Sequence, residues 1–352
     1  MKIRITKNKK PKKKPVEVKG FGKVFTDHQF AMDYENGQWG HARIESYRDF
    51  SLPPSTSVFH YGQSVFEGLK AYKNEEGEIR LFRPKENFKR MNESCARLCI
   101  PAFDEEFVLS ALKELVNIDA DWIPTAKGTA LYIRPSCMGI DAELGVHAAR
   151  KYVFFIILSP VGAYYSGGLS PVKLLVEEHY TRAGIGGTGA NKVVGNYAAS
   201  LIASEKAIKQ GCDQVLWLDA ANRKYIEEVG SMNIFFVLNG KVVTPALSGS
   251  ILPGITRKTA MEYLTASGFE VEERTISIDE IVEGSKSGAL TESFGTGTAA
   301  VISPVGSFVY NDKEYKVGDG KMGEVATKLY NDLTAIQTGE KEDPFGWVVK
   351  IS

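Results

Sequence analysis

The chain has few cysteines, and their positions suggest neither a bridge nor a metal centre. Four occur among 352 residues: Cys95, Cys99, Cys137 and Cys212. They form no C-x-x-C pair and show no zinc-site spacing. We therefore expect no metal and no disulfide framework, and we predict reduced thiols in a cytoplasmic protein.

The sequence also lacks a net charge and a long apolar run. Lys and Arg together number 43, as do Asp and Glu. The longest apolar run covers residues 152–158, far short of the roughly 18 residues needed to span a membrane. We predict a buried strand there, no membrane protein, and no nucleic-acid-binding body.

Positive charge is concentrated at the N-terminus. Residues 1–20 carry nine Lys or Arg and one Glu, a balance of +8, which leaves about −8 on the remainder of the neutral chain. This segment has no apolar stretch of the kind found in secretory signals. We predict a solvated, disordered arm over 1–20, with weak contact to a polyanion as the alternative.

Length and patterning indicate two further parts. A chain of 352 residues is too long for one ordinary core. Residues 21–160 are strand-rich with two predicted helices, and residues 161–181 are predicted to be an interdomain connector because their first part is rich in Gly, Pro and Ser. Strands alternate with helices over 182–352. The predicted fold class is therefore α/β, with a small α+β domain and a larger α/β domain.

Lys192 stands at the end of an unusual stretch. Five of the eight residues in 184–191 are Gly or Ala, which lets the backbone approach a flat ligand closely. A helix is predicted after it, over 196–211, with Leu201, Ile202 and Ile208 on one apolar face. The lysine therefore lies where a loop becomes a helix.

Other interpretations of this stretch compete. A lysine at a loop end is most often a solvated charge. The letters GIGGTG fit the dinucleotide pattern G-x-G-x-x-G, but no buried strand immediately precedes them. A nucleotide P-loop needs Gly-Lys-Ser/Thr, whereas the triplet here is Asn191-Lys192-Val193. Context therefore argues against both nucleotide-binding patterns.

Lys192, followed by Gly195-Asn196-Tyr197, closely resembles the catalytic segment of the branched-chain aminotransferases. These are fold-type IV enzymes that use pyridoxal phosphate. The resemblance runs from about Phe21 to the C-terminus. It implies two domains of the D-amino-acid-aminotransferase-like fold, the cofactor in the cleft, a homodimer, and reversible amino transfer from leucine, isoleucine or valine to 2-oxoglutarate.

Pyridoxal phosphate requires a partly desolvated lysine for its Schiff base and a carboxylate at the ring nitrogen. Lys192 is the candidate lysine. The residues alone offer both Glu227 and Glu228 as the carboxylate, and the resemblance selects Glu228, the acid directly before Val-Gly. It also assigns Tyr197 to the ring hydroxyl.

The phosphate requires anion-binding groups. After Pro253-Gly254 a helix is predicted, whose Ile255 N–H and Thr256 capping hydroxyl would bind it. Two glycines, at 295 and 297, would permit a second backbone nest beside Thr298. The resemblance adds Arg90, whose planar fork suits an oxyanion.

Substrate residues follow from the resemblance. An aromatic wall suits branched aliphatic side chains, and its polar rim would meet the second carboxylate of glutamate. Ala299 N–H would hold the α-carboxylate, and Val146 ends a loop lent by a partner subunit. The residues assigned to the wall and rim are Tyr61, Phe66, Tyr132, Arg134 and Tyr164.

Two classes of alternative remain. The nearer is another fold-type IV activity, D-amino-acid transfer or aminodeoxychorismate lyase chemistry. The other is a dinucleotide-binding protein or a non-catalytic scaffold that binds the cofactor. One departure is clear: Ala300 and Ser303 stand where some eukaryotic members carry a Cys-x-x-Cys pair, so we expect no thiol switch there.

Overall fold

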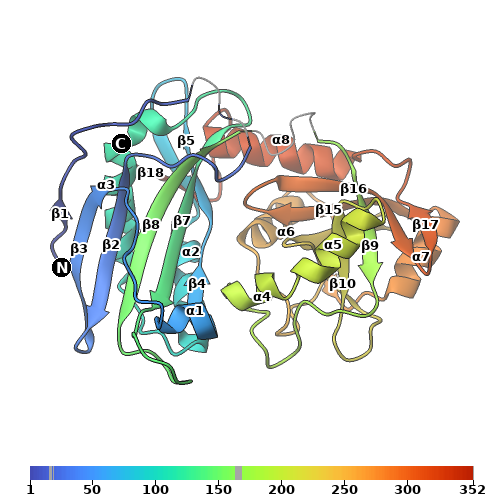
Figure 1. Ribbon diagram of the computed structural model, residues 1–352. Helices are drawn as coiled ribbons and strands as arrows, with labels where there is room; N and C mark the ends of the chain where they lie inside the picture. Colours follow the sequence, from blue (N-terminus) through green and yellow to red (C-terminus); the bar gives the residue numbers. More distant parts are fainter. Residues whose placement is uncertain (16–17, 19, 163–168, 352) are drawn as a thin grey trace. The chain divides into compact units, whose positions relative to one another are not determined.

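The computed structural model describes residues 1–15, 18, 20–162 and 169–351. The chain forms two compact units (Figure 1). The first unit comprises Met1–Ser166, Asn191–Val194 and Ala335–Ser352. The second comprises Gly167–Ala190 and Gly195–Thr334. The Lys192 segment thus belongs to the first unit, although the residues on both sides of it belong to the second.

The first unit is built on a sheet of nine described strands, in the order β1-β3-β2-β8-β7-β5-β6-β18, with β4 beside β7. Neighbours are antiparallel except for β1 and β3. The strands are β1 (Arg4–Ile5), β2 (His28–Glu35), β3 (Gln38–Ser46), β4 (Ser64–Phe66), β5 (Leu69–Lys73), β6 (Ile79–Phe82), β7 (Ala130–Gly139), β8 (Tyr152–Val161) and β18 (Val348–Lys350).

Helices cover this sheet and close its core. They are α1 (Ser57–Tyr61), α2 (Pro84–Arg97), α3 (Glu105–Ile118) and the 3₁₀ turn Ala120–Trp122. Helix α2 begins with a proline in its first turn. Helix α3 is capped by the Asp104 side chain, which accepts a hydrogen bond from Phe107 N–H at 3.0 Å. Their apolar faces pack on β2, β7 and β8 in one buried cluster.

The second unit has a mixed sheet, in the order β11-β10-β9-β16-β15-β12-β13-β14, with β17 beside β16. The strands are β9 (Val172–Glu177), β10 (Gln214–Leu218), β11 (Ile226–Val229), β12 (Asn233–Leu238), β13 (Lys241–Pro245), β14 (Val271–Arg274), β15 (Leu290–Gly297), β16 (Val301–Tyr310) and β17 (Lys313–Lys316). The helices are α4 (Val194–Ala198), α5 (Leu201–Lys209), α6 (Ile255–Ala266), α7 (Ile278–Ser287) and α8 (Glu324–Thr338). The first residue of α4 and residues 335–338 of α8 belong to the first unit. Both units thus combine sheets with helices, as the sequence predicts.

The N-terminal arm differs from the disordered segment expected over 1–20. Its strand β1 pairs in parallel with β3, and Lys12 N–H donates to Asp27 Oδ1 at 2.8 Å. The Lys12 ammonium also lies 4.5 Å from the centroid of the Tyr47 ring. Specific contacts with the first sheet therefore hold this basic segment, while most of its side chains remain exposed.

The helix after Lys192 also differs from expectation, because it is divided into α4 and α5. Leu201, Ile202 and Ile208 are 65%, 54% and 62% exposed, so their apolar face is not the packed one. Ala203 and Ala207 are the buried residues of α5 and pack near Trp217. Small side chains let the helix approach the sheet closely, which the hydrophobicity pattern did not indicate.

No helix in the described part of the chain is long and apolar enough to cross a membrane.

A lysine is buried in the first sheet. Lys70 lies on β5 opposite Tyr132 of β7, and 9% of it is exposed. Burial lowers the pKa of Lys70 to about 8, because the charged form loses hydration. Its pKa in the unfolded chain is near 10.5. Between these values the unfolded chain binds more protons than the folded one, so this group makes stability rise with pH.

We predict that Lys70→Met raises the free energy of unfolding at pH 7, because the folded state no longer buries a charge. The gain should shrink as the pH approaches about 10.5. Urea unfolding of both proteins at pH 7 and pH 10 measures this. Lys73→Met, at the less buried end of the same strand, controls for the loss of one positive charge. Parallel stability curves for wild type and Lys70→Met would contradict the prediction.

Candidate functional site

The backbone around Lys192 is fixed by the first unit. Its N–H donates to Ser94 Oγ at 2.9 Å, and its carbonyl accepts from Phe66 N–H at 3.2 Å. The next residue, Val193, forms an isolated bridge with Val65. These contacts hold the chain on both sides of the lysine Cα. Contacts with helix α2 and strand β4 therefore fix the position of the Lys192 Cα, from which the side chain extends.

Glu67, directly after β4, is the most buried carboxylate near Lys192, at 0% exposed. Arg90 on α2 binds it through two contacts, Nε to Oε1 at 2.8 Å and Nη2 to Oε2 at 2.9 Å. Asn87 Nδ2 donates to Oε2 at 2.8 Å. Asn87 and Arg90 are three residues apart, so they share one helix face. Both oxygens of the Glu67 carboxylate are therefore bound by side chains of the first unit.

Burial alone would raise the pKa of Glu67. The charge and hydrogen bonds of Arg90, aided by the charge of Lys192 and the amide of Asn87, outweigh that effect and lower the pKa. Glu67 is therefore a carboxylate at neutral pH. Sequence reasoning did not select it, although it lies beside Phe66, because nothing in the spacing pairs it with an arginine 23 residues later.

Three of the expected substrate residues lie together in the first unit. The Arg134 guanidinium carbon lies 4.6 Å from the Phe66 ring centroid and 5.3 Å from that of Tyr132. Arg134 Nη2 also donates to the Tyr132 hydroxyl at 2.9 Å. Lys192 Nζ lies 5.0 Å from the Phe66 centroid. Phe66 thus contacts both the lysine and the arginine.

Gly68 shows how tightly this cluster is built. A Cβ at this position would lie 2.1 Å from the Tyr132 hydroxyl oxygen. Only the absence of a side chain permits the tyrosine to occupy its position. The expected wall residue Tyr164 lies outside the described residues.

Tyr61 and Val146 belong to another part of the first unit. The Tyr61 hydroxyl accepts a hydrogen bond from Gly145 N–H at 3.0 Å. Val146, next along this loop, is 87% exposed. The structure therefore ties Tyr61 to the loop of Val146.

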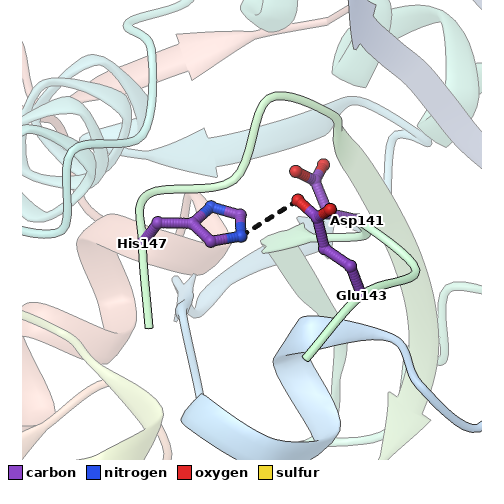
Figure 2. Close-up of side chains that lie close together, drawn as sticks. All are labelled: Asp141, Glu143 and His147. Carbon is purple, nitrogen blue, oxygen red and sulfur yellow. Dashed lines mark ion pairs between the residues drawn. The ribbon is translucent and has the colours of Figure 1, made fainter. Parts of the chain in front are cut away.

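Side-chain pairs hold this loop, and Figure 2 shows the pair of Glu143 and His147, with Asp141 nearby. His147 Nε2 lies 3.0 Å from Glu143 Oε1. Ligand atoms of the three residues lie within 4.8 Å of one another. Asp141 accepts N–H groups of Arg150 and Lys151, and the Arg150 side chain pairs with both acids. Because a guanidinium already balances these carboxylates, we assign the cluster to loop structure.

In the second unit, Glu228 is 3% exposed and held at both oxygens. Its Oε2 lies 2.5 Å from Arg182 Nε. Its Oε1 accepts from Asn233 Nδ2 at 3.2 Å and from Leu252 N–H at 3.0 Å. Sequence reasoning did not single out Arg182, which stands 46 residues before its partner.

The adjacent acid, Glu227, is also buried but differently bound. Its Oε1 accepts a hydrogen bond from the Ser250 hydroxyl, while its buried Oε2 has no hydrogen-bond partner among the described residues. Burial raises the pKa of Glu227, and the Ser250 hydrogen bond and the Arg182 charge oppose this only partly. Neighbouring residues of a strand point to opposite faces, so the two acids face different surroundings.

Helix α6 offers backbone N–H groups at its start. It begins at Ile255 with Gly254 as the N-cap, and no side chain caps it. Thr256 is the second helical residue, so it does not cap the helix as expected. The amides of Ile255 and Thr256 have no acceptor within the helix. A Cβ on Gly254 would lie 1.9 Å from Asn233 Oδ1, so the helix start is packed against the residue that binds Glu228.

The turn carrying Thr298 and Ala299 differs from the expected glycine nest. Gly295 and Gly297 lie on β15 without positive φ angles, and their missing side chains make room for Met232. Positive φ occurs instead at Val301, at 64°, where Ile302 N–H bonds to Ala300 O at 2.8 Å. For a β-branched residue this is strained. The strain lies at the end of the turn that presents Thr298 and Ala299.

These residues fit pyridoxal phosphate. Thr296 Oγ1 is buried without a hydrogen-bond partner among the described residues, and Thr296 pairs with Asn233 across β12 and β15. The second unit thus presents an unsatisfied hydroxyl, a buried carboxylate and helix-start amides. Tyr197 lies half-buried on α4. The first unit supplies a lysine beside an arginine and aromatic rings.

Comparisons agree with this chemistry. The family model "Amino-transferase class IV" matches residues 64–308. Branched-chain-amino-acid transaminase 1 of Bacillus subtilis (strain 168) is 55% identical over 94% of this chain and 94% of its own length. Branched-chain-amino-acid aminotransferase 2 of the same strain is 52% identical over 100% of this chain and 97% of its own.

Solved structures show the same fold. The branched-chain amino acid aminotransferase of Escherichia coli superposes with a TM-score of 0.76 at 26% identity, over 93% of this chain and 99% of that one. A branched-chain amino acid aminotransferase from T.th., complexed with N-(5′-phosphopyridoxyl)-L-glutamate, gives 0.74 at 27%, over 91% and 98%. The fold class expected from the sequence is thereby confirmed.

We predict that Glu67→Gln destabilises the protein by about 3–5 kcal/mol at pH 7, because it leaves the buried Arg90 without a charged partner. The wild-type pKa of Glu67 is lowered, so its carboxylate stabilises the fold above pH ~4.5 and loses this effect as the pH falls through the folded-state pKa. The difference should therefore shrink in acid.

Urea unfolding of both proteins at pH 7 and at pH 3.5–4 (about the range in which a carboxyl titrates) tests this. Glu106→Gln breaks an exposed pair with Lys85 and serves as the control, with little expected change. If both substitutions lowered the free energy of unfolding by the same amount at pH 7, breaking the buried Glu67–Arg90 pair would be no more destabilising than breaking an exposed one, which would contradict the prediction.

Proposed function

The chain belongs to the class IV aminotransferases, and from this we propose that Lys192 and Glu228 perform pyridoxal-phosphate-dependent transamination of branched-chain amino acids. The reaction is reversible transfer of the amino group of leucine, isoleucine or valine to 2-oxoglutarate. The observation that carries the assignment of residues is the fixed backbone of Lys192 beside Phe66 and the Glu67–Arg90 pair.

When bound, the cofactor supplies an aldehyde that attaches to amines and a ring that withdraws electrons from the substrate Cα. The lysine amine has two tasks. It would hold the cofactor at rest, and it would move the proton of the substrate Cα, first as base and then as acid. A fixed backbone suits this role, because the amine must return to one position in each half-reaction.

Glu228 holds a proton on the ring nitrogen, since a buried carboxylate favours the charged N–H. Burial raises the pKa of its rival Glu227, so Glu227 takes up a proton more readily, and the Ser250 hydroxyl already donates to one of its oxygens. Glu227 therefore suits the role of an anionic partner for the ring N–H less well. Tyr197 donates to the ring hydroxyl. Asn233 and Leu252 N–H orient the Glu228 carboxylate.

The first amides of α6, at Ile255 and Thr256, would hold the phosphate of the cofactor, because the helix dipole favours an anion at this end. Thr298 and Arg90 contribute further hydrogen bonds. Because Glu67 balances the Arg90 charge, Arg90 acts here more through directed N–H groups than through net charge. The other positive contribution comes from the helix terminus.

Substrate selection rests on the first unit. Phe66 and Tyr132 form the apolar wall of the chain's own pocket, Tyr61 is contributed by the partner subunit, and Tyr164 stays an expectation from the sequence. Each methylene buried against this wall is worth about 0.8 kcal/mol. Arg134, stacked on Phe66 and bonded to the Tyr132 hydroxyl, receives the second carboxylate of glutamate. A backbone N–H at Ala299 holds the α-carboxylate.

We further propose a cytoplasmic homodimer in which the loop of Val146 enters the partner's pocket. Leu144 and Val146 are 69% and 87% exposed, which is costly for apolar side chains that remain uncovered. Because Tyr61 is bonded to this loop, we assign Tyr61 to the partner's pocket as well. The four cysteines are free, in keeping with a reducing compartment.

D-amino-acid transfer and aminodeoxychorismate lyase chemistry are not favoured. The curated relatives at 52% and 55% identity are branched-chain enzymes over nearly the whole chain. A dinucleotide-binding protein is excluded by the family to which the chain belongs.

We expect kcat/KM for leucine as amino donor to exceed that for alanine by tens-fold or more. The two differ by three carbons, so roughly 2 kcal/mol of transition-state binding is available. Aspartate should fail, because its short side chain buries a carboxylate against the wall. Steady-state assays with 2-oxoglutarate and leucine, isoleucine, valine, alanine, aspartate or D-alanine measure this ranking. Preference for aspartate or D-alanine would overturn the substrate assignment.

A further inference from the structure

Arg182 occupies a central position in the second unit. Its side chain is 9% exposed. Its Nε lies 2.5 Å from Glu228 Oε2, and its Nη2 donates to the carbonyls of Gly189, at 3.2 Å, and Ser250. One guanidinium therefore contacts the buried acid and two separate backbone segments.

The electrostatic part of this arrangement concerns Glu228. A buried carboxylate is costly unless a cation and hydrogen bonds compensate it. Asn233 and Leu252 N–H bond to one oxygen, and Arg182 pairs with the other. Arginine stays charged under all ordinary conditions. The ion pair with Arg182 thus compensates the buried charge of the carboxylate, while the two hydrogen bonds at Oε1 orient it.

The mechanical part concerns the Gly-rich loop. Gly189 stands three residues before Lys192, and a Cβ there would lie 2.1 Å from Ser250 O. The loop and the Ser250 segment are therefore in close backbone contact. The Arg182 guanidinium bonds to a carbonyl of each. Without this guanidinium, the carbonyls of Gly189 and Ser250 would each lose a hydrogen bond, and Glu228 would lose its ion pair.

We propose that Arg182 is a positioning residue that holds Glu228 as an oriented carboxylate and ties the Gly-rich loop before Lys192 to it. This inference rests on the proposed role of Glu228 at the ring nitrogen. Arg182 itself takes no part in the bond changes. Its effect on the reaction passes through Glu228 and through the loop.

The adjacent acid, Glu227, provides a control that separates the role of Glu228 from a general effect of removing a buried carboxylate. Glu227 is buried and bonded to Ser250, so it shares a neighbour with Arg182, whereas the ion pair of the guanidinium is with Glu228. Glu227→Gln therefore removes a buried acid from the same strand without removing the partner of Arg182. It is the matched control for Glu228→Gln.

The test is a double-mutant cycle on the cofactor-loaded enzyme with Arg182→Gln, Glu228→Gln and the double variant. The readouts are kcat, the dissociation constant of pyridoxal phosphate, and the pH at which the absorption of the bound cofactor changes. We expect Arg182→Gln to lower kcat by about tenfold or more and to shift that spectroscopic pH. When Arg182→Gln is added to Glu228→Gln, we expect kcat to fall by less than about threefold relative to Glu228→Gln alone.

Two further variants make the result decisive. Arg182→Lys keeps the charge but not the planar fork, so it should restore the spectroscopic pH more fully than kcat. Arg43→Gln breaks the pairs of another largely buried arginine, with Asp33 and Glu45, and should leave kcat and the spectrum unchanged. If Arg182→Gln does not fold, Arg182→Lys carries the test through the same cycle.

Additive effects of Arg182→Gln and Glu228→Gln, or an unchanged spectroscopic pH in the Arg182 variants, would overturn the inference. Failure of the proposed function is distinct from this. It would appear as absent transamination by the wild type, or as wild-type turnover in Glu228→Gln, whatever the Arg182 variants do.

Discussion

The attachment of the Lys192 backbone to the first unit is the constraint on which the account depends. The segment 191–194 belongs by its contacts to that unit, while the chain on both sides belongs to the second. Ser94 Oγ and Phe66 N–H hold the lysine at its own amide and carbonyl. A reactive amine gains from such fixation, because its side chain then has few positions from which to act.

The structure contains two buried arginine–carboxylate pairs, one in each unit. In the first unit, Arg90 and Glu67 neutralise one another, and the Lys192 charge adds to the stabilisation of the carboxylate. In the second unit, Arg182 and Glu228 form a similar pair. Removing one partner of such a pair leaves an uncompensated buried charge, which destabilises the fold by about 3–5 kcal/mol.

The sequence predicted the fold class and the lysine stretch because both depend on local pattern. A short stretch of sequence is enough to recognise the apolar strand at 152–158 and the Pro253-Gly254 break before α6. The ion pairs could not be predicted in this way, because Glu67 and Arg90 are brought together only by the packing of α2 on β4. The same is true of Arg182 and Glu228.

Local pattern was also misleading in two places. It favoured Leu201 and its apolar neighbours as the packed face of a helix, yet close approach to the sheet requires the small Ala203 and Ala207. It interpreted Gly295 and Gly297 as an anion nest, whereas their missing side chains accommodate Met232. In both cases tertiary packing decided which small residues were needed.

The central claim, that Lys192 is the reactive amine, is tested most directly by reducing the purified enzyme with borohydride and mapping the modified peptide. The account predicts one pyridoxyl label, on Lys192, and none in Lys192→Ala. The chain offers a competing lysine, because burial lowers the pKa of Lys70 to about 8. A label on Lys70, or on any other lysine, would contradict the account.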